Sequence, residues 1–509
     1  MNRLIISTLF LISVTYGTGV AQYVERAVLY NQTSFGGTAR TQAIGPQVSL
    51  GGDVGLVPFN PAGLGFFNQS EFTISPALRV SSAQADYLGQ TTDDSDARGG
   101  IDNLGLVFNF GGNSETPSAW RSSLSINYSK SNSFYRAYTY DGLNTNSDLL
   151  DHVVNEANLD RDAGLEGSSL SVLAFDNYLI ENFFQPTPGG DTIVFDGRNQ
   201  DLGVPAQDYP VRQIDSYTLS GTQSKWNFAY GGNFNDKVYL GVGVDILGIN
   251  NVTIREYQEQ PTASTILDQY TLTERRETQG TGINATLGAI YRPINPVTVG
   301  LSYTTPTIYS MSEVYRIGMR SSWNNYTFPP TNEVLNEVDP LPFENDRFDF
   351  TLRTPQKVRG GLSYFFEKYG FLSASVEWLD YTGNRFTADQ NALGIDNDLV
   401  SNTLQSVVNL NVGGEFRYEA LRVRGGYGML GNPYTTGDEG KSTRISGGVG
   451  LRFANYFVDL GIVNTRFTEL SSPYIFAASD YVSENDLNTP TATIDNSITN
   501  IVFTLGFNF

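Results

Sequence analysis

Residues 501–509 read IVFTLGFNF, and their pattern decides the fold. Every odd-numbered position in this stretch is large and apolar, whereas the even-numbered positions carry Val502, Thr504, Gly506 and Asn508. Alternation with a period of two gives a β-strand one apolar face. An unpaired apolar edge strand invites aggregation, but in a closed barrel the last strand pairs with the first and its apolar face meets lipid. The stretch therefore predicts a transmembrane β-barrel.

The same alternation recurs along the chain and predicts fourteen strands, an even number as in outer-membrane barrels made of one chain. Short connections such as Asn235-Asp236 alternate with long polar connections such as 142–221, the asymmetry expected between periplasmic turns and extracellular loops. The predicted strands are 70–80, 101–111, 120–140, 222–235, 237–258, 269–292, 296–317, 348–367, 370–385, 404–418, 420–430, 441–453, 455–467 and 497–509. We therefore predict an all-β fold, a fourteen-stranded antiparallel transmembrane β-barrel over residues 68–509 with long extracellular loops.

Composition and the N-terminal residues indicate export. The chain of 509 residues has no cysteine and a formal net charge of −21, which argues against a nucleic acid partner. Residues 1–21 combine Arg3, an apolar run over 4–14 and the small residues before Gln22, as in a cleaved secretory signal peptide. We expect location in the outer membrane of a Gram-negative cell. The alternative is a secreted soluble all-β protein.

Residues 22–67 are rich in Gly, Ala, Thr and Gln and show little strand alternation. We interpret them as an N-terminal plug, or hatch, because a fourteen-stranded barrel lies between small barrels filled by their own side chains and open porins. The plug is predicted to end at the turn Asn60-Pro61-Ala62. The alternative is a mobile periplasmic tail.

Three stretches of the sequence are informative when compared with known families: FGGTARTQAIGPQVSLGGDVGLVPFNPAGLGFF at 35–67, GTGINATLGAIYRPINPVTVGLSYTTP at 280–306 and LNVGGEFRYEALRVRGGYGMLGNPY at 410–434. They resemble the FadL/TodX family of outer-membrane transporters for long-chain fatty acids and other hydrophobic compounds. The resemblance implies a fourteen-strand barrel with a hatch. It also implies that ligands enter among the extracellular loops, pass to a pocket in the barrel and leave laterally through a kinked third strand. The third predicted strand, 120–140, contains neither Gly nor Pro, so the sequence itself predicts no kink.

The long loop after the third strand contains the apolar stretch SSLSVLAFDNYLIENFFQPTP at 168–188. We interpret it as a loop helix, ended by Pro186, that borders a hydrophobic groove, since each buried CH₂ group of a ligand contributes about 0.8 kcal/mol. The candidate ligand-binding residues are Leu170, Leu173, Phe175, Tyr178, Leu179, Phe183 and Phe184. The alternative is a self-contained core within the loop.

Arginines that face into the barrel form a second candidate ligand-binding site. Arg424 and Arg444 lie away from the short turns, and a guanidinium fork suits the carboxylate head group of a ligand. The alternative is that the inward arginines pair with the plug or with the acidic side chains of Glu377, Glu415, Asp245 and Asp459.

Other chemistry is disfavoured. The acidic clusters near Asp93 and Asp148 lack the ligand spacing of a known calcium loop, so no metal site is predicted. His152 is the single histidine and no Gly-x-Ser-x-Gly elbow accompanies it, so we predict no catalytic residues, no enzyme activity and no cofactor.

These observations predict a monomeric outer-membrane transporter for passive uptake of hydrophobic small molecules such as long-chain fatty acids. Its surroundings would be outer-membrane lipid and lipopolysaccharide. The alternative is a non-transporting outer-membrane barrel that acts as a partner in a protein secretion or assembly complex.

Overall fold

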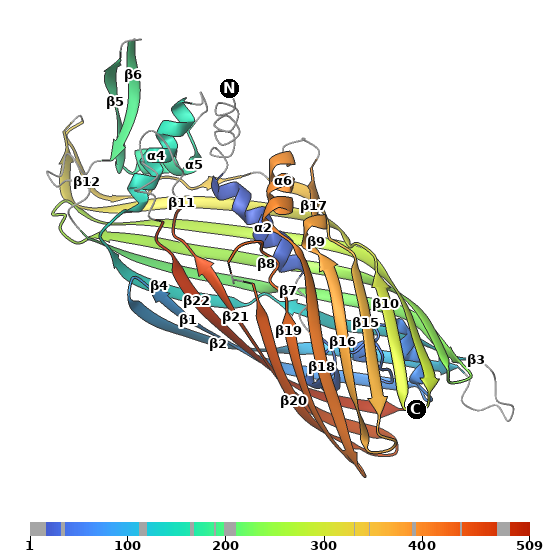
Figure 1. The fold of residues 1–509 in the computed structure, drawn as a ribbon. Coiled ribbons are helices and arrows are strands. Elements are labelled where there is room, and N and C mark those ends of the chain that lie inside the picture. The colour runs from blue at the N-terminus through green and yellow to red at the C-terminus, as the bar shows by residue number, and fades with distance from the viewer. Residues whose placement is uncertain are drawn as a thin grey trace.

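The first and last strands of the sheet pair with each other and close the barrel (Figure 1). In the computed structural model, β1 (Glu71–Tyr87) lies antiparallel to β22 (Ala492–Asn508) along nearly its whole length. Within β22, Phe503 and Phe507 are exposed on the outside, whereas Thr504 is fully buried. The C-terminal stretch therefore closes the wall, with its apolar face outward, as its alternation predicts.

The structure describes residues 17–31, 36–110, 120–162, 167–187, 190–197, 210–329, 331–345, 347–388, 393–437, 440–475 and 489–509. Within these residues the wall has fourteen antiparallel strands, which confirms the predicted number. Ten strands are single segments: β1, β2 (Gln90–Phe110), β7 (Val211–Phe234), β8 (Val238–Pro261), β9 (Leu267–Ile294), β18 (Ser406–Tyr418), β19 (Leu421–Leu430), β20 (Ser442–Arg452), β21 (Tyr456–Ser471) and β22.

The other four strands each consist of two segments. They are β3 (Trp120–Ser133) with β4 (Arg136–Asn144), β10 (Val297–Thr304) with β11 (Ile308–Phe328), β14 (Phe348–Arg353) with β15 (Lys357–Phe365), and β16 (Gly370–Asp380) with β17 (Arg385–Thr387). Shorter elements occupy the loops: α4 (Leu149–Asp162), α5 (Ser169–Asp176), the hairpin of β5 (Ile180–Thr187) and β6 (Gly190–Gly197), β12 (Glu333–Val338), β13 (Phe343–Glu344), η4 (Tyr381–Gly383) and α6 (Gly394–Thr403).

The two faces of the wall follow the predicted parity. On β16, Leu372 and Trp378 are exposed to the outside, whereas Ser373 and Glu377 are buried against the lumen contents. Periplasmic turns are tight: Asn235 and Asp236 both have φ of 54°, the left-handed conformation that a two-residue hairpin turn requires.

Several strands continue beyond their predicted ends. β1 is expected to end near residue 80 and β2 to begin near residue 101. Their ladder instead continues to the turn at Leu88-Gly89. Asp93 and Asp94 therefore lie on a strand and not in a loop, and Gln84 Nε2 donates to Asp93 Oδ1 at 3.0 Å across the ladder. Residues 90–100 of β2 are polar or small and none of them is buried, so the alternation that reveals strands inside a membrane is absent on this side of the hairpin.

The N-terminal residues enter the barrel before the first strand (Figure 1). They form α2 (Gly17–Asn31), α3 (Ala39–Ile44), η1 (Val54–Leu56) and η2 (Pro61–Phe66). α3 packs against β18 to β22, and η2 packs against β3 and β7 to β9 on the opposite wall. Residues 1–16 of the predicted signal peptide lie outside the described residues, and its cleavage site after Ala21 falls within α2. In the described part of the chain, no helix has the length and apolar character needed to span a membrane.

The outward parity of β21 leads to a test of the membrane position. Leu460, which is 46% exposed, faces outward in the lower half of the strand, whereas Asn464 faces outward close to Arg466 and the rim. We expect Leu460→Lys to destabilise the barrel by about 2–4 kcal/mol and Asn464→Lys by about 0–1 kcal/mol, because a charge costs most at the midplane. Urea unfolding in lipid vesicles measures both values, and equal values would contradict the assigned membrane position.

Candidate ligand-binding site and hatch

Residues 36–67, here called the hatch segment, lie directly against the peptide backbone of the wall. A Cβ atom on Gly461 would lie 2.5 Å from the carbonyl oxygen of Ala39, and one on Gly413 would overlap the carbonyl oxygen of Ile44. The wall glycines whose missing side chain admits backbone atoms of the hatch segment in this way are Gly231, Gly241, Gly300, Gly413, Gly426 and Gly461. Gly105, Gly288 and Gly448 admit its side chains Val54, Asn60 and Ala43. Glycine on these strands therefore makes room for close backbone approach.

The turn Asn60-Pro61-Ala62 fixes the end of the hatch segment. The Asn60 side chain accepts from the backbone N–H of Ala62 at 3.1 Å and donates to the Val48 carbonyl at 2.6 Å. Pro61 sits at the start of η2, where a missing N–H costs no hydrogen bond. The motif thus connects two parts of the hatch segment just before β1 begins.

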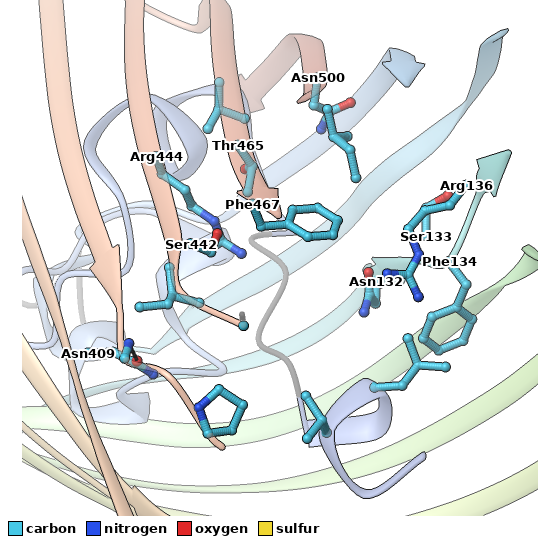
Figure 2. A pocket seen from close by; sticks show the side chains of 18 of the residues that line it. Asn132, Ser133, Phe134, Arg136, Asn409, Ser442, Arg444, Thr465, Phe467 and Asn500 are labelled. Atoms are coloured by element: carbon cyan, nitrogen blue, oxygen red, sulfur yellow. Dashed lines mark hydrogen bonds between the residues drawn. The ribbon is translucent and has the colours of Figure 1, made fainter. Parts of the chain in front are cut away.

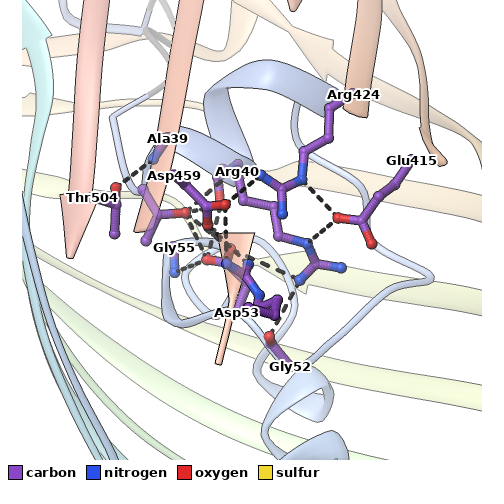
Figure 3. A network of polar contacts seen from close by, with 12 residues as sticks. Ala39, Arg40, Gly52, Asp53, Gly55, Glu415, Arg424, Asp459 and Thr504 are labelled. Carbon is purple, nitrogen blue, oxygen red and sulfur yellow. Dashed lines mark hydrogen bonds and ion pairs between the residues drawn. The ribbon is translucent and has the colours of Figure 1, made fainter. Parts of the chain in front are cut away.

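An ionic network joins the hatch segment to the wall (Figure 3). Arg40 Nε lies 3.2 Å from Glu415 Oε2, and Arg424 Nε lies 2.6 Å from the same oxygen. Arg424 Nη1 also lies 2.7 Å from Asp459 Oδ1. The guanidinium of Arg424 therefore binds two wall carboxylates, one of which it shares with the hatch segment. This is the pairing given above as the alternative to a head-group receptor.

α2 packs inside the barrel above the hatch segment. Its buried residues Val24, Ala27 and Val28 belong to a cluster that includes Leu379 and Tyr381 of the wall. Arg26 Nη2 lies 2.8 Å from Glu313 Oε1, and Asn31 donates to Asn384 Oδ1 at 2.7 Å. The helix is thus held by polar contacts at its middle and at its C-terminal end, and by apolar packing along the same part. Whether residues 22–67 act as a plug remains a prediction.

The third strand is broken between β3 and β4, at Phe134 and Tyr135. The ladder between β2 and β3 ends at the pair Asn103↔Ser129, and β4 pairs with β7 alone. From the break, β4 turns into the lumen, where Tyr138 and Tyr140 pack with residues of β1 and β22 such as Ala85 and Ile494. In the described structure, the outer half of β2 therefore has a paired strand on its β1 side only.

The glycine that permits this break lies in the neighbouring strand. Gly221 of β7 has φ of 128°, and any side chain on it would collide with Asn250 and Asn251. Its carbonyl accepts from Phe134 N at 3.1 Å, and the buried Phe134 ring packs edge-on against Tyr30 of α2 at 5.9 Å. The third strand contains no Gly or Pro, so reading that strand alone misses the break. Gly221 is the signal in the sequence that points to it.

Side chains, and not a backbone ladder, cover the gap beside the break. The Arg98 guanidinium of β2 lies 3.6 Å above the centre of the Tyr135 ring. Lys130 of β3 extends its ammonium group over Gly100 of β2. Long side chains change rotamers on far shorter timescales than strands separate. The wall is therefore closed here by side chains that can change conformation easily.

A cavity of about 110 Å³ lies in the lumen directly inside the break (Figure 2). Its lining combines apolar side chains, such as Phe134 of the break, Phe467 of β21 and Val28 of α2, with polar ones from the opposite strands. Arg444, Asn409 and Asn500 are among the polar lining residues. Its volume is close to that of a cavity that holds benzene, roughly 150 Å³. A longer ligand would need α2 or the lining side chains to move.

Arg444, the second predicted arginine, lines this cavity from β20 and is buried. Arg136 lines the cavity from β4, beside the break, and forms an ion pair with Glu469 of β21. The cavity thus has an apolar surface and guanidinium groups at its border. Of the two arginines proposed for a head group, the structure places Arg444 at the cavity and Arg424 in the ionic network.

The apolar loop residues lie apart from this cavity, in the loop layer around α4 and α5. Leu173 and Leu179 are buried in a cluster with strand residues such as Tyr270 and Met319, and Leu170 and Tyr178 pack at its border. Phe175 remains 45% exposed. These contacts correspond to the alternative of a core within the loops. A groove beside Phe175 stays a prediction.

The predicted loop helix is shorter than expected. α5 ends at Asp176, and Phe183 and Phe184 belong to β5, where they pair with Val194 and Ile193 of β6. Asn177 ends the helix because its side chain donates both to Leu173 O of the last turn and to Met319 O of β11. A contact with a distant strand therefore decides the boundary, and the local sequence does not reveal it.

The described residues contain no cluster of side chains suited to a metal ion. No group of three or more His, Asp or Glu side chains there has the arrangement to hold a metal ion. Burial in α4 lowers the pKa of His152 to about 4, and its ring stacks on Tyr474. The imidazole is therefore neutral at physiological pH.

Comparison with solved structures supports the architecture. A FadL homologue of Pseudomonas aeruginosa matches with a TM-score of 0.53 and 10% identity over 94% of this chain and 99% of that one. The barrel has the FadL/TodX fold. The P. putida toluene transporter TodX matches with a TM-score of 0.52 and 13% identity over the same shares. No model of a protein family matches the sequence, and no significant match was found among curated proteins.

The glycine contacts lead to a test of the hatch segment. Gly413→Val places a side chain against Ile44 O, and overpacking of this kind typically costs about 1–3 kcal/mol. We expect the barrel to fold, the hatch segment to shift and the conductance in planar bilayers to rise. The control is Gly447→Val, because Gly447 faces outward and its added Cβ would be 3.6 Å from the nearest atom. Wild-type conductance in Gly413→Val would show that this contact does not seal the lumen.

Proposed function

We propose that the protein is an outer-membrane channel for passive uptake of hydrophobic small molecules. The observation that carries this proposal is the position of the lumen cavity, which lies directly inside the break between β3 and β4. A ligand in the cavity is separated from the outside of the barrel by movable side chains and not by a ladder of hydrogen bonds. The route runs from the extracellular loops through the cavity to the break, and then laterally into the membrane.

The lining suits a ligand that is mainly apolar with one polar end. Each CH₂ group transferred from water to the cavity contributes about 0.8 kcal/mol, and the rings of Phe134 and Phe467 provide the apolar contact. Arg444 offers a guanidinium fork to a carboxylate, so a long-chain fatty acid is one proposed ligand. A compact aromatic compound needs less movement of α2 than a long-chain ligand does. The toluene transporter named above has the same fold, which is consistent with either ligand.

The hatch segment keeps water and ions out while the ligand passes above it. The contacts of α3 with β18 to β22 and of η2 with β3 and β7 to β9, on opposite walls, support this role. We propose that residues 1–21 are removed on export, that the mature chain is a monomer, and that outer-membrane lipid and lipopolysaccharide surround the wall.

A cross-link tests the lateral exit. The chain has no cysteine, so Arg98→Cys with Tyr135→Cys provides a unique pair across the gap beside the break. Joining this pair with a short bis-maleimide should abolish uptake of radiolabelled oleate by whole cells, while the unjoined pair transports.

The control pair, Gln84→Cys with Asp93→Cys, spans the continuous ladder of β1 and β2 and should transport when joined. If the cross-linked pair at the gap transports as fast as the unjoined pair, the ligand leaves by another route.

A second substitution tests the loop layer. Phe175→Asp replaces an exposed apolar side chain of α5, and we expect slower uptake of oleate with an unchanged heat-modifiable barrel. Leu341→Asp is the matched control, because Leu341 is 90% exposed in another loop. Equal uptake by both variants and the wild type would remove Phe175 from the proposed route.

A further inference from the structure

The cavity inside the break has three charged side chains in its lining, and all three are arginines: Arg79 of β1, Arg136 of β4 and Arg444 of β20. No aspartate or glutamate of the described residues belongs to this lining. The carboxylates paired with Arg79 and Arg136 are those of Asp102 and Glu469, which lie outside the lining. A ligand in the cavity therefore meets positive charge and no negative charge.

Arg79 differs from other arginines of the lumen in its contacts. Its side chain is 11% exposed, and its Nη2 lies 3.9 Å from Asp102 Oδ2, which is close enough for an ion pair but too long for a hydrogen bond. Other lumen arginines have a carboxylate oxygen at 2.5–3.2 Å, namely Arg26, Arg40, Arg136, Arg359 and Arg424. Arg79 is thus balanced in charge but not bound directly.

The partner carboxylate is held by two amides. Asp102 Oδ2 accepts from Gln42 Nε2 of the hatch segment at 3.0 Å and from Asn500 Nδ2 of β22 at 2.7 Å. Arg79 Nε is buried and has no hydrogen-bond partner among the described residues. A guanidinium has five N–H donors, and burying them without partners is unfavourable. An oxyanion in the cavity would supply the missing acceptors.

Aromatic and apolar side chains line the same space. Phe134, Phe467 and Val28 share the lining with Arg79, so one ligand can contact an apolar surface and a guanidinium at once. The volume of about 110 Å³ is close to that of a cavity that holds benzene. A long chain needs more movement of α2 than a single ring does, and a neutral ring leaves the donors of Arg79 unfilled. A single ring that carries one carboxylate matches both features.

We propose that Arg79 determines the specificity of this cavity and that its preferred ligands are compact aromatic carboxylates. This inference rests on the proposed function, because it concerns the ligand of the same cavity. The carboxylate accepts hydrogen bonds from the guanidinium fork of Arg79, whose planar geometry suits two oxygens. The ring of the ligand contacts Phe134 and Phe467. Asp102 stays behind Arg79 and keeps its charge balanced when the cavity is empty.

Calorimetric titration of the full chain in lipid nanodiscs at pH 7 tests the proposal, with benzoate as the probe and benzyl alcohol as its neutral counterpart. The two compounds have the same ring, and only benzoate is charged. We expect benzoate to bind about tenfold more tightly, the effect of a charge-assisted hydrogen bond. Arg79→Gln should weaken benzoate binding about tenfold and leave benzyl alcohol binding unchanged.

The outcomes separate this inference from the proposed function. If benzyl alcohol binds as tightly as benzoate, the specificity assigned to Arg79 is overturned while the hydrophobic channel stands. If neither compound binds, the cavity is no ligand site and the proposed function loses its central observation as well.

Three further variants separate ligand binding from a structural role. Arg466→Gln is the matched control, because Arg466 is exposed on the outer face of β21 and its loss changes the net charge equally. It should leave benzoate binding unchanged, and equal weakening by Arg466→Gln and Arg79→Gln would overturn the proposal. Arg79→Lys keeps the charge without the fork, so it should bind benzoate with intermediate affinity, and it replaces Arg79→Gln if that variant does not fold.

Asp102→Asn gives the sharpest distinction. It removes the carboxylate that competes for Arg79 but keeps an oxygen for Gln42 and Asn500. Benzoate should therefore bind this variant more tightly than the wild type. If Asp102→Asn weakens benzoate binding as Arg79→Gln does, Arg79 only holds Asp102 in place and the proposal is overturned.

Discussion

A backbone N–H or C=O group without a hydrogen-bond partner in hydrocarbon costs several kcal/mol. The architecture follows from the need to pair these groups within the wall. The pairing of β1 with β22 removes both edges of the sheet at once. The ladder between β2 and β3 ends early, and β4 would expose unpaired backbone groups if it stayed in the wall beside β2 without pairing. This early end is tolerated because β4 turns inward and keeps its hydrogen bonds with β7. The break therefore leaves one unpaired edge, on the outer half of β2, and the side chains of Arg98 and Lys130 cover it.

The wall was predictable from sequence wherever lipid lies on one side and the lumen on the other. Leu372 and Ser373 are an example, because Leu372 faces the lipid outside the barrel and its neighbour Ser373 faces the lumen. Sequence reading failed for the outer part of β2, where Asp93 lies on a strand paired with β1 but residues 90–100 have no buried face. Water imposes no alternation, so nothing in the local pattern distinguishes such a strand from a loop.

The candidate site was predictable only in part, because its geometry depends on residues far apart in the chain. The alternation of inward and outward residues placed Arg444 on the lumen side, where it lines the cavity. Only the structure shows that Arg424 forms ion pairs with Glu415 and Asp459. The break in the third strand depends on Gly221 in the fourth, and the end of α5 depends on a carbonyl of β11. Reading one element at a time cannot reveal a constraint that another element imposes.

The contact between hatch segment and wall has a consequence for evolutionary drift. Carbonyl groups of Ala39 and Ile44 meet glycines of the wall, so the fit is made largely by atoms that every residue possesses. Replacing a side chain elsewhere on the hatch segment leaves such a fit intact, as it leaves the ladders of the wall intact. A chain that shares only 10% of its residues with this one can therefore have the same barrel fold. In this chain, the fit depends on the absence of side chains at a few wall positions.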